Sequence, residues 1–288
     1  MNVLSLFDGM SCGRIALDRA GISVDRYYAS EIDKYAIKVS GVNYPDIIQL
    51  GDVTQWESWD IDWGSIDLLI GGSPCQGFSF AGKQLAFDDP RSALFFVYVE
   101  ILDHIKKVNP AAKFILENVK MKSEHLDIIS EHLEVEPVFL NSALLSAQNR
   151  QRYYWSNLSI LQPDDLNITM KDIVEPGYYS TREKSYCLDA NYGKGTNFRR
   201  YFFCGSRQLV LEEGYVPENL TKESANEIMH KDGNRWRKLT VKECERLQTA
   251  PEGYVDGAEI PKVEKYKVLG NGWTVDVIAH ILKGLKDA

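Results

Sequence analysis

The sequence has few cysteines, and none of them are paired at a spacing that binds metal or forms a redox couple. Five cysteines are spread over 288 residues, at Cys12, Cys75, Cys187, Cys204 and Cys244. Zinc ribbons and thioredoxin-type centres need C-x-x-C pairs, and this chain has none. We therefore expect free thiols and no bound metal.

Long apolar runs are also missing. No stretch approaches the roughly 18 consecutive apolar residues that a membrane-spanning helix needs. The first ten residues, MNVLSLFDGM, lack the basic flank and long apolar core of a secretory leader. We expect a cytoplasmic protein with no membrane partner.

The charge is acidic overall but unevenly distributed. The formal net charge is −8, which would repel a polyanion if it were spread evenly. Residues 150–238, however, carry 14 Lys and Arg against 12 Asp and Glu, and they include the basic and aromatic stretch GKGTNFRRYFFCGSR. This segment is compatible with a nucleic-acid surface, although a solvated loop would look similar.

The N-terminal half alternates short apolar runs with amphipathic segments. We expect strands at 3–7, 26–30, 47–50, 66–70 and 113–116, and helices at 14–20, 34–40 and 92–107. Gly21 should end the first helix. Repeated strand–helix units predict an α/β fold with a doubly wound, mostly parallel sheet.

The regular pattern of apolar and amphipathic segments ends in the second half of the chain. Between about Asn157 and Pro261 the sequence is irregular and rich in turns, and 275–285 then reads as an amphipathic helix that returns to the sheet. We expect a sheet domain at 1–157, a second, smaller and irregular domain at 158–262, and a returning segment at 263–288.

Chemically useful residues follow several of the expected strands. In doubly wound sheets, ligands bind at the carboxyl ends of the strands, and the loops FDGMSCG, SEID, GDV, GGSPCQG and LENV all fall there. The NAD fingerprint G-x-G-x-x-G is absent. Glu31 and Asp52 follow successive strands, so together they predict a pocket for an adenosine-containing ligand. Each carboxylate alone would suit a helix cap equally well.

Cys75 stands in the turn GGSPCQG directly after an apolar strand. Cysteines that serve only packing usually sit among apolar neighbours inside an element, so a cysteine in such a turn suggests chemistry. A turn cysteine without a chemical role is the less favoured reading.

These motifs together resemble the DNA (cytosine-5) methyltransferases, most closely the de novo class. The resemblance rests on LFDGMSCG, SEID, GDV, the PCQ at Pro74-Cys75-Gln76, ENV at 117–119, the Q-x-R-x-R from Gln148 to Arg152, RKLTVKECERLQTAP from Arg237 and GNGWTV from Gly270, all in the family's order. It covers nearly the whole chain except the middle segment. It implies a Rossmann-like fold that uses S-adenosylmethionine and releases S-adenosylhomocysteine.

The resemblance also implies the cofactor contacts. These are Phe7, Asp8, Gly9, Gly13, Glu31, Ile32, Asp52, Val53, Leu94, Asn271 and Trp273. Trp273 suits a place in the core equally well.

For the catalytic centre, the resemblance implies four residues. Carbon 5 of cytosine is a poor nucleophile, so a thiolate must first add to carbon 6, and Cys75 takes that role. Glu117 would donate or share a proton at ring nitrogen 3. Arg152 would contact the base oxygen, and Arg150 would anchor a phosphate or the catalytic loop.

Duplex DNA is the partner that the resemblance implies, and it would place the protein at the nucleoid in a prokaryote or phage. The cytosine must leave the stacked helix to reach Cys75. Residues 158–262 would then form the target-recognition domain. The expected DNA contacts are Gln76, Ser79, Arg150, Lys194, Arg199, Arg200 and Arg207.

Two alternatives stay open. One branch of the family methylates transfer RNA, although the CFT signature of that branch is absent here. A catalytically inactive DNA-binding relative is the other alternative, and the intact PCQ, ENV and Q-x-R-x-R motifs argue against it. The sequence leaves the recognition site and the oligomeric state undetermined.

Overall fold

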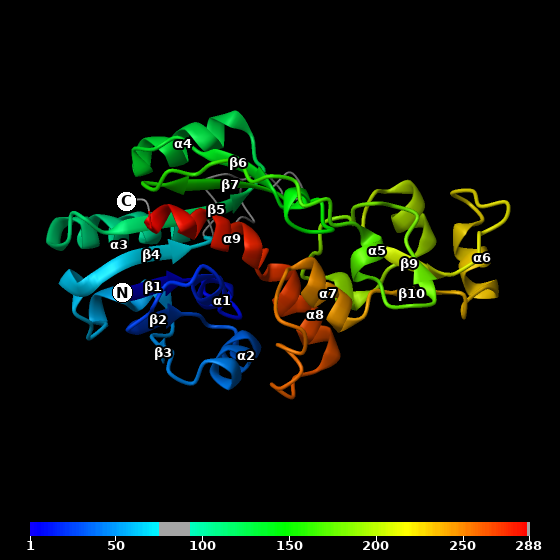
Figure 1. Cartoon of the computed structure of the whole chain (residues 1–288), viewed down its shortest axis with the longest axis horizontal. Helices are drawn as coiled ribbons and strands as arrows, with labels where there is room; N and C mark the ends of the chain where they lie inside the picture. Colours follow the sequence, from blue (N-terminus) through cyan, green and yellow to red (C-terminus); the bar gives the residue numbers. More distant parts are fainter. Residues whose placement is uncertain (75–92, 287–288) are drawn as a thin grey trace. The chain divides into compact units, whose positions relative to one another are not determined.

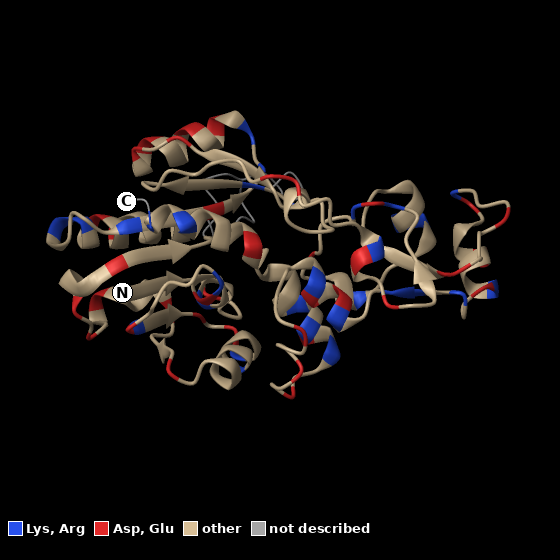
Figure 2. Cartoon of the chain, in the orientation of Figure 1, with Lys and Arg blue, Asp and Glu red and all other residues tan. Residues whose placement is uncertain are grey.

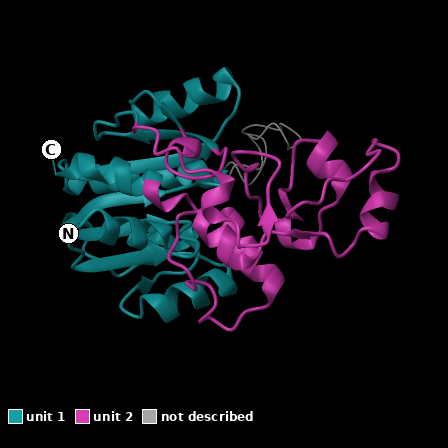
Figure 3. Cartoon of the chain, turned by 45° about the vertical axis from the view of Figure 1, so that its right-hand side comes forward, with its two compact units in different colours: residues 1–140, 151–162, 277–288 teal, residues 141–150, 163–276 magenta. Residues whose placement is uncertain are grey.

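The computed structural model describes residues 1–74 and 93–286. The chain divides into two compact units, shown in Figure 3. Unit 1 comprises residues 1–140, 151–162 and 277–288, and unit 2 comprises residues 141–150 and 163–276. The expected catalytic and recognition roles of these two parts of the chain stay predictions.

Unit 1 is built on a sheet that is parallel except at one side. Within the described residues, seven strands lie in the order β3-β2-β1-β4-β5-β7-β6 (Figure 1). Their bounds are β1 Asn2–Leu6, β2 Arg26–Ser30, β3 Ile48–Gln49, β4 Ile66–Gly71, β5 Lys113–Val119, β6 Val138–Asn141 and β7 Gln151–Ser156. The pairs β1–β2, β1–β4, β2–β3 and β4–β5 are parallel, whereas β7 runs antiparallel to β5. The predicted mostly parallel α/β sheet is confirmed.

Helices connect most of the strands of unit 1. They are α1 Cys12–Arg19, α2 Lys34–Asn43, α3 Ala93–Val108, α4 Ser123–Leu133 and α9 Val275–Leu282, of which α9 begins in unit 2. As expected, α1 stops just before Gly21, whose φ of +66° favours glycine. No helix in the described residues is long and apolar enough to cross a membrane.

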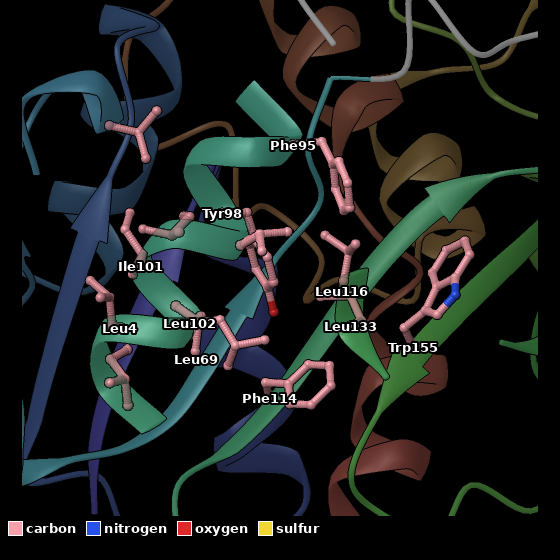
Figure 4. Packing of buried hydrophobic residues seen from close by; sticks show 14 of the residues in the cluster. Leu4, Leu69, Phe95, Tyr98, Ile101, Leu102, Phe114, Leu116, Leu133 and Trp155 are labelled. Atoms are coloured by element: carbon pink, nitrogen blue, oxygen red, sulfur yellow. The ribbon is translucent and has the colours of Figure 1, made fainter. Parts of the chain in front are cut away.

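The main core of unit 1 lies between α3 and the sheet. The buried side chains of α3 recur three or four positions apart, which places them on one face of the helix. They are Phe95, Tyr98, Val99, Ile101, Leu102 and Ile105. Figure 4 shows Phe95, Tyr98, Ile101 and Leu102 of this helix beside side chains of three neighbouring strands, Leu4, Leu69, Phe114 and Leu116. Each large apolar side chain buried here contributes roughly 1.5–3 kcal/mol, so β4 and β5 are held rigidly.

Strand β5 is longer than its apolar run predicts. It continues past Leu116 to Val119, so Glu117 and Asn118 lie inside the strand and not in a following loop. The extension is stabilised by β7, which pairs Tyr154 with Glu117 and Arg152 with Val119. β7 was not predicted from the sequence, because its residues, QRYYWS, lack a simple apolar alternation.

Unit 2 has more regular structure than its sequence suggests. Its described residues include a three-stranded antiparallel sheet in the order β10-β9-β8, formed by Trp236–Lys238, Leu209–Glu212 and Tyr178–Tyr179. The helices are α5 Met170–Ile173, α6 Ala225–Lys231, α7 Val241–Leu247 and α8 Lys262–Asn271. Strands of two to four residues are too short to show a period, and for this reason the segment read as irregular.

Candidate functional site

The loop after β1 has a backbone that leaves one side of it open. Phe7, Gly9 and Ser11 all have left-handed φ values, at 57°, 61° and 62°. A Cβ atom built on Gly9 would meet no atom within 4 Å, so a ligand can approach the main chain there. Gly13 lies farther on, buried in the first turn of α1.

The Asp8 side chain is buried and surrounded by hydroxyl groups. Its carboxylate accepts hydrogen bonds from Ser5 Oγ at 2.6 Å, from Tyr27 Oη at 2.7 Å and from Ser11 Oγ. Burial, with a smaller contribution from the charge of Glu31, raises the pKa of Asp8 to about 6 despite these hydrogen bonds. Asp8 was predicted to bind the cofactor, and in the structure its side chain braces the loop from inside.

Glu31, which follows β2, connects two of the loops. Its Oε2 accepts the Gly9 amide at 2.8 Å, and its Oε1 accepts the amides of Ile32 and Asp33, both at 2.8 Å. A carboxylate has about four acceptor positions, so three donors leave one for a ribose hydroxyl. Ile32 is 75% exposed beside it and offers an apolar surface.

Asp52 lies after β3 and caps a short helical segment, Val53–Ser58. Its Oδ1 accepts hydrogen bonds from the amide and the hydroxyl of Thr54, both at 2.9 Å. Val53 is buried behind it. Asp52 therefore acts as a helix cap through Oδ1, and the residue as a whole is exposed, so a ligand can reach it.

These loops lie at one edge because β1, β2 and β3 are parallel neighbours. Ser30 Oγ donates to Gly51 O at 2.7 Å and Asp8 N donates to Ser30 O at 3.1 Å, which ties the three strand ends together. An open backbone, two acceptor carboxylates and an exposed isoleucine suit the adenosine half of S-adenosylmethionine.

The other predicted cofactor contacts are scattered through the fold. Leu94 is half-buried in the first turn of α3 and packs on the core of unit 1. Asn271, which is exposed at the end of α8, and the half-buried Trp273 both belong to unit 2. The structure leaves both readings of Trp273 open, and the cofactor roles of all three stay predictions.

Glu117 and Arg152 form a close ion pair on adjacent strands. Arg152 Nε lies 2.6 Å from Glu117 Oε1, and the two side chains are only 14% and 10% exposed. Two predicted catalytic residues that are 35 positions apart in sequence therefore meet on one face of β5 and β7. A pair this shielded from water interacts more strongly than an exposed one.

The turn after β4 is tied to the same strand. Asn118 Nδ2 donates to Ser73 Oγ at 3.3 Å, which brings the beginning of GGSPCQG to the residue next to Glu117. The predicted nucleophile Cys75 and the predicted DNA contacts Gln76 and Ser79 lie outside the described residues. The chain thus reaches Pro74 close to the Glu117 pair.

Arg150, two positions before Arg152, makes quite different contacts. It is 5% exposed and donates to Leu188 O at 3.1 Å, Gly272 O at 2.9 Å and Cys187 Sγ at 3.3 Å. This burial disfavours a phosphate contact. The other predicted role, anchoring the catalytic loop, concerns residues outside the described ones and stays a prediction.

The remaining predicted DNA contacts gather within residues 194–207 of unit 2. Lys194, Arg199 and Arg200 are exposed, whereas Arg207 is half-buried and lies 3.8 Å from Asp189. Sequence reasoning missed two further cations. Lys238 Nζ donates to Gly193 O at 3.1 Å, and burial, with smaller contributions from the charges of Lys262 and Arg207, lowers the pKa of Lys238. They come from distant segments, so no local pattern could have identified them.

No group of three or more His, Cys, Asp or Glu side chains in residues 1–74 and 93–286 is arranged to hold a metal ion.

Comparison with known families agrees with this geometry. A family model described as C-5 cytosine-specific DNA methylase matches residues 1–287. The chain belongs to that family. Its members methylate carbon 5 of cytosine in DNA, and this DNA methylase is accordingly an enzyme.

Several relatives of this DNA methylase are similar over most of its length. The type II methyltransferase M1.ScrFI of Lactococcus lactis subsp. cremoris is 31% identical, covering 97% of this chain and 76% of the relative. The type II methyltransferase M.NlaX of Neisseria lactamica is 29% identical, over 99% and 96%. A crystal structure of a Spodoptera frugiperda DNMT2 mutant matches with a TM-score of 0.71 at 20% identity, over 99% of both chains, which shows a shared fold.

Proposed function

We propose that this DNA methylase transfers a methyl group from S-adenosylmethionine to carbon 5 of a cytosine flipped out of a short specific duplex site. The buried ion pair of Glu117 and Arg152 is the observation that supports this proposal most directly. It provides an acid and a fixed cation on rigid strands, and Asn118 ties the turn that leads to Cys75 to the same strand.

In this proposal Cys75 supplies the thiolate that adds to carbon 6 of the ring. The addition moves electrons toward ring nitrogen 3, where Glu117 would hold or donate a proton. Arg152 would contact the base oxygen and fix the orientation of Glu117. Preorganised groups of this kind stabilise developing charge without further rearrangement.

The cofactor would lie at the ends of β1, β2 and β3. Glu31 would accept from the ribose, Asp52 would accept from the adenine amino group, and the main chain near Gly9 would line the pocket. When bound, S-adenosylmethionine supplies an electrophilic methyl group on a sulfonium. The described side chains are suited to hold and orient it, and Asp8 supports the loop from within the fold.

Unit 2 would hold the duplex. Lys194, Arg199 and Arg200 are exposed, so their charges would pair with backbone phosphates of the duplex. Figure 2 shows Lys and Arg interspersed with Asp and Glu, with both signs dense on α7 and α8. The type II designation of M1.ScrFI and M.NlaX is extended to this chain as part of the same proposal.

A covalent trap tests the role of Cys75. Duplex DNA with 5-fluorocytosine at the target should form a stable adduct with the wild type, because fluorine cannot leave as a proton does. Cys75→Ala should form no adduct and transfer no methyl group, whereas the matched control Cys204→Ala, at an exposed free cysteine, should behave as wild type. Substantial methyl transfer by Cys75→Ala would refute the mechanism.

Replacing Glu117 with glutamine tests the proton at ring nitrogen 3. The substitution keeps the shape but removes the transferable proton, so kcat should fall by about 10²- to 10⁴-fold with little change in DNA affinity. Normal turnover would leave Glu117 with a structural role only.

Substrate class is tested with labelled methyl groups. Label from S-adenosylmethionine should enter duplex DNA and not transfer RNA, and bisulfite sequencing of DNA from expressing cells should reveal the site. DNA affinity should fall steeply with salt, and removing the charges of Arg199 and Arg200 should flatten that dependence. If label enters transfer RNA alone, the proposal that DNA is the substrate is wrong, whereas the proposed methyl-transfer chemistry still stands.

A further inference from the structure

The Q-x-R-x-R motif is divided between the two units. Gln148 and Arg150 belong to unit 2, whereas Arg152 belongs to unit 1. The boundary between the units falls within the motif, between Arg150 and Gln151. The three polar side chains of the motif consequently have different surroundings, and only Arg152 pairs with Glu117.

Residues 142–150 connect two neighbouring strands of the unit 1 sheet. β6 ends at Asn141 and β7 begins at Gln151. This connection is held by the segment 184–185 of unit 2. Lys184 Nζ donates to the carbonyls of Ala143, Ser146 and Ile168, and Ser185 exchanges main-chain hydrogen bonds with Ala147 and Asn149. All three protons of the Lys184 ammonium are therefore used to hold the backbone.

The last residues of the connection are held even more firmly. The side-chain amide of Gln148 accepts from Leu188 N at 2.7 Å and donates to Gln248 Oε1 at 3.0 Å. The guanidinium of Arg150 reaches Leu188 O and Gly272 O at the same time. Since Gln148 is fully buried and Arg150 nearly so, these contacts cannot be replaced readily by water.

The place where β7 begins decides whether Arg152 can meet Glu117. Arg152 pairs with Val119, and Tyr154 pairs with Glu117, so the ion pair is a diagonal contact on one face of the sheet. A slip of β7 by one residue would turn Arg152 to the opposite face. The position at which the connection ends and β7 begins therefore sets whether Arg152 and Glu117 lie on the same face of the sheet.

We propose that Gln148, Arg150 and Lys184 are positioning residues, which set the register of β7 and so hold Arg152 against Glu117. This inference rests on the proposed function for its catalytic consequence. None of the three residues touches the reacting base in this scheme. Contacts within unit 2 thereby determine the geometry of a pair in unit 1 through the covalent chain.

The substitution Arg150→Lys separates this role from a phosphate contact. Lysine keeps the charge, so a phosphate contact would largely survive. It cannot span Leu188 O and Gly272 O together, so the positioning role would be lost. We expect kcat to fall 10-fold or more, because displacements of about 1 Å can cost about 10²-fold. DNA affinity and its slope with salt should stay unchanged.

A second variant acts on the same connection from a different residue. Lys184→Met keeps an unbranched side chain of nearly the same length but leaves three carbonyls without their donor, and it should show the same selective loss of kcat. Arg235→Lys is the matched control, because Arg235 is an exposed arginine of unit 2 whose side chain pairs with Glu212 and lies over the ring of Tyr215. It should leave kcat unchanged.

Amide hydrogen exchange provides a readout that needs no activity. Protection of residues 152–154 should fall in Arg150→Lys and Lys184→Met and stay as in wild type in Arg235→Lys. S-adenosylmethionine binding by each variant checks that unit 1 is folded, and if Arg150→Lys does not fold, Lys184→Met decides alone.

The inference is overturned if Arg150→Lys or Lys184→Met keeps both normal kcat and normal protection of β7. It is also overturned if Arg150→Met loses DNA affinity with a smaller salt slope while Arg150→Lys retains both, since that pattern marks a phosphate contact. If the wild type methylates no DNA, the proposed function fails, and the exchange experiment still decides the register.

Discussion

The interior of unit 1 and the interior of unit 2 are stabilised by different kinds of contact. In unit 1, α3 shares an apolar cluster with strands of the sheet, and the cluster includes the fully buried Phe95, Tyr98 and Phe114. In unit 2, many of the long-range ties run from polar side chains to main-chain carbonyls. The first kind of cohesion is non-directional, whereas the second depends on geometry.

The polar ties of unit 2 connect segments that are far apart in sequence. Tyr266 Oη donates to Leu239 O at 2.8 Å, Arg246 donates to Ile173 O at 2.8 Å, and Lys238 donates to Gly193 O at 3.1 Å. One apolar cluster of unit 2, around Phe198 and Leu211, is small. Unit 1 should therefore be most sensitive to lost volume, and unit 2 to lost donors.

Phe114→Ala should give the largest effect. Phe114 is fully buried on β5, and removing a buried phenyl ring costs about 3–5 kcal/mol in free energy of unfolding. Urea unfolding measures the loss, and hydrogen exchange should place it in unit 1. A loss below about 1 kcal/mol would mean that apolar packing does not dominate there.

Asp8 is a buried carboxyl group within unit 1 and should make the stability of that unit depend on pH. Its pKa is raised from 3.8 to about 6 in the folded state, so the folded form binds the proton more tightly than the unfolded form. Relative to Asp8→Asn, the wild type should lose on the order of 2–3 kcal/mol as the pH rises from about 4 to about 6. Parallel pH profiles for the two proteins would contradict this.

In unit 2, Gln248→Met should show that losing a hydrogen-bond donor costs more free energy of unfolding than a change in apolar shape does. Gln248 Nε2 donates to Leu269 O at 2.6 Å and to Gly272 O at 3.0 Å, and a thioether can replace neither bond. The expected cost is about 2 kcal/mol for buried groups that lose their partner. Leu116→Met in the core of unit 1 is the control, and it should cost less than about 1.5 kcal/mol. Equal losses would remove the distinction between the units.

Tyr98→Phe should give the smallest effect, and it should be stabilising. The Tyr98 hydroxyl is buried without a hydrogen-bond partner among the described residues, and burial raises the pKa of Tyr98 well above its ordinary value. Deleting it should raise the free energy of unfolding by about 1 kcal/mol. A destabilised variant would indicate that this hydroxyl is satisfied.

The same contrast explains what could be predicted from sequence. The parallel strands and α1, α2 and α3 were placed to within a few residues, because apolar periodicity records which face is buried. The pairing of β5 with β7 was not predicted. It depends on the distant residues of β7, and the mixed sequence QRYYWS shows no period.

The candidate site was predicted in part for a similar reason. Glu31, Asp52, Glu117 and Arg152 were identified by motif and by their places near strand ends. Other contacts join separate segments of the chain. Asp8 accepts hydrogen bonds from Tyr27 and Ser11, and Lys184 donates to three main-chain carbonyls. Such contacts leave no signal in the local pattern, so only the structure reveals them.

The division of the chain has a consequence for building chimeric enzymes. The backbone passes between the units four times, after residues 140, 150, 162 and 276. Exchanging only residues 163–276 with a relative would leave the short piece 141–150 behind, facing foreign partners at Gln148 and Arg150. If unit 2 reads the DNA as proposed, a graft that is meant to change sequence preference must carry both pieces together.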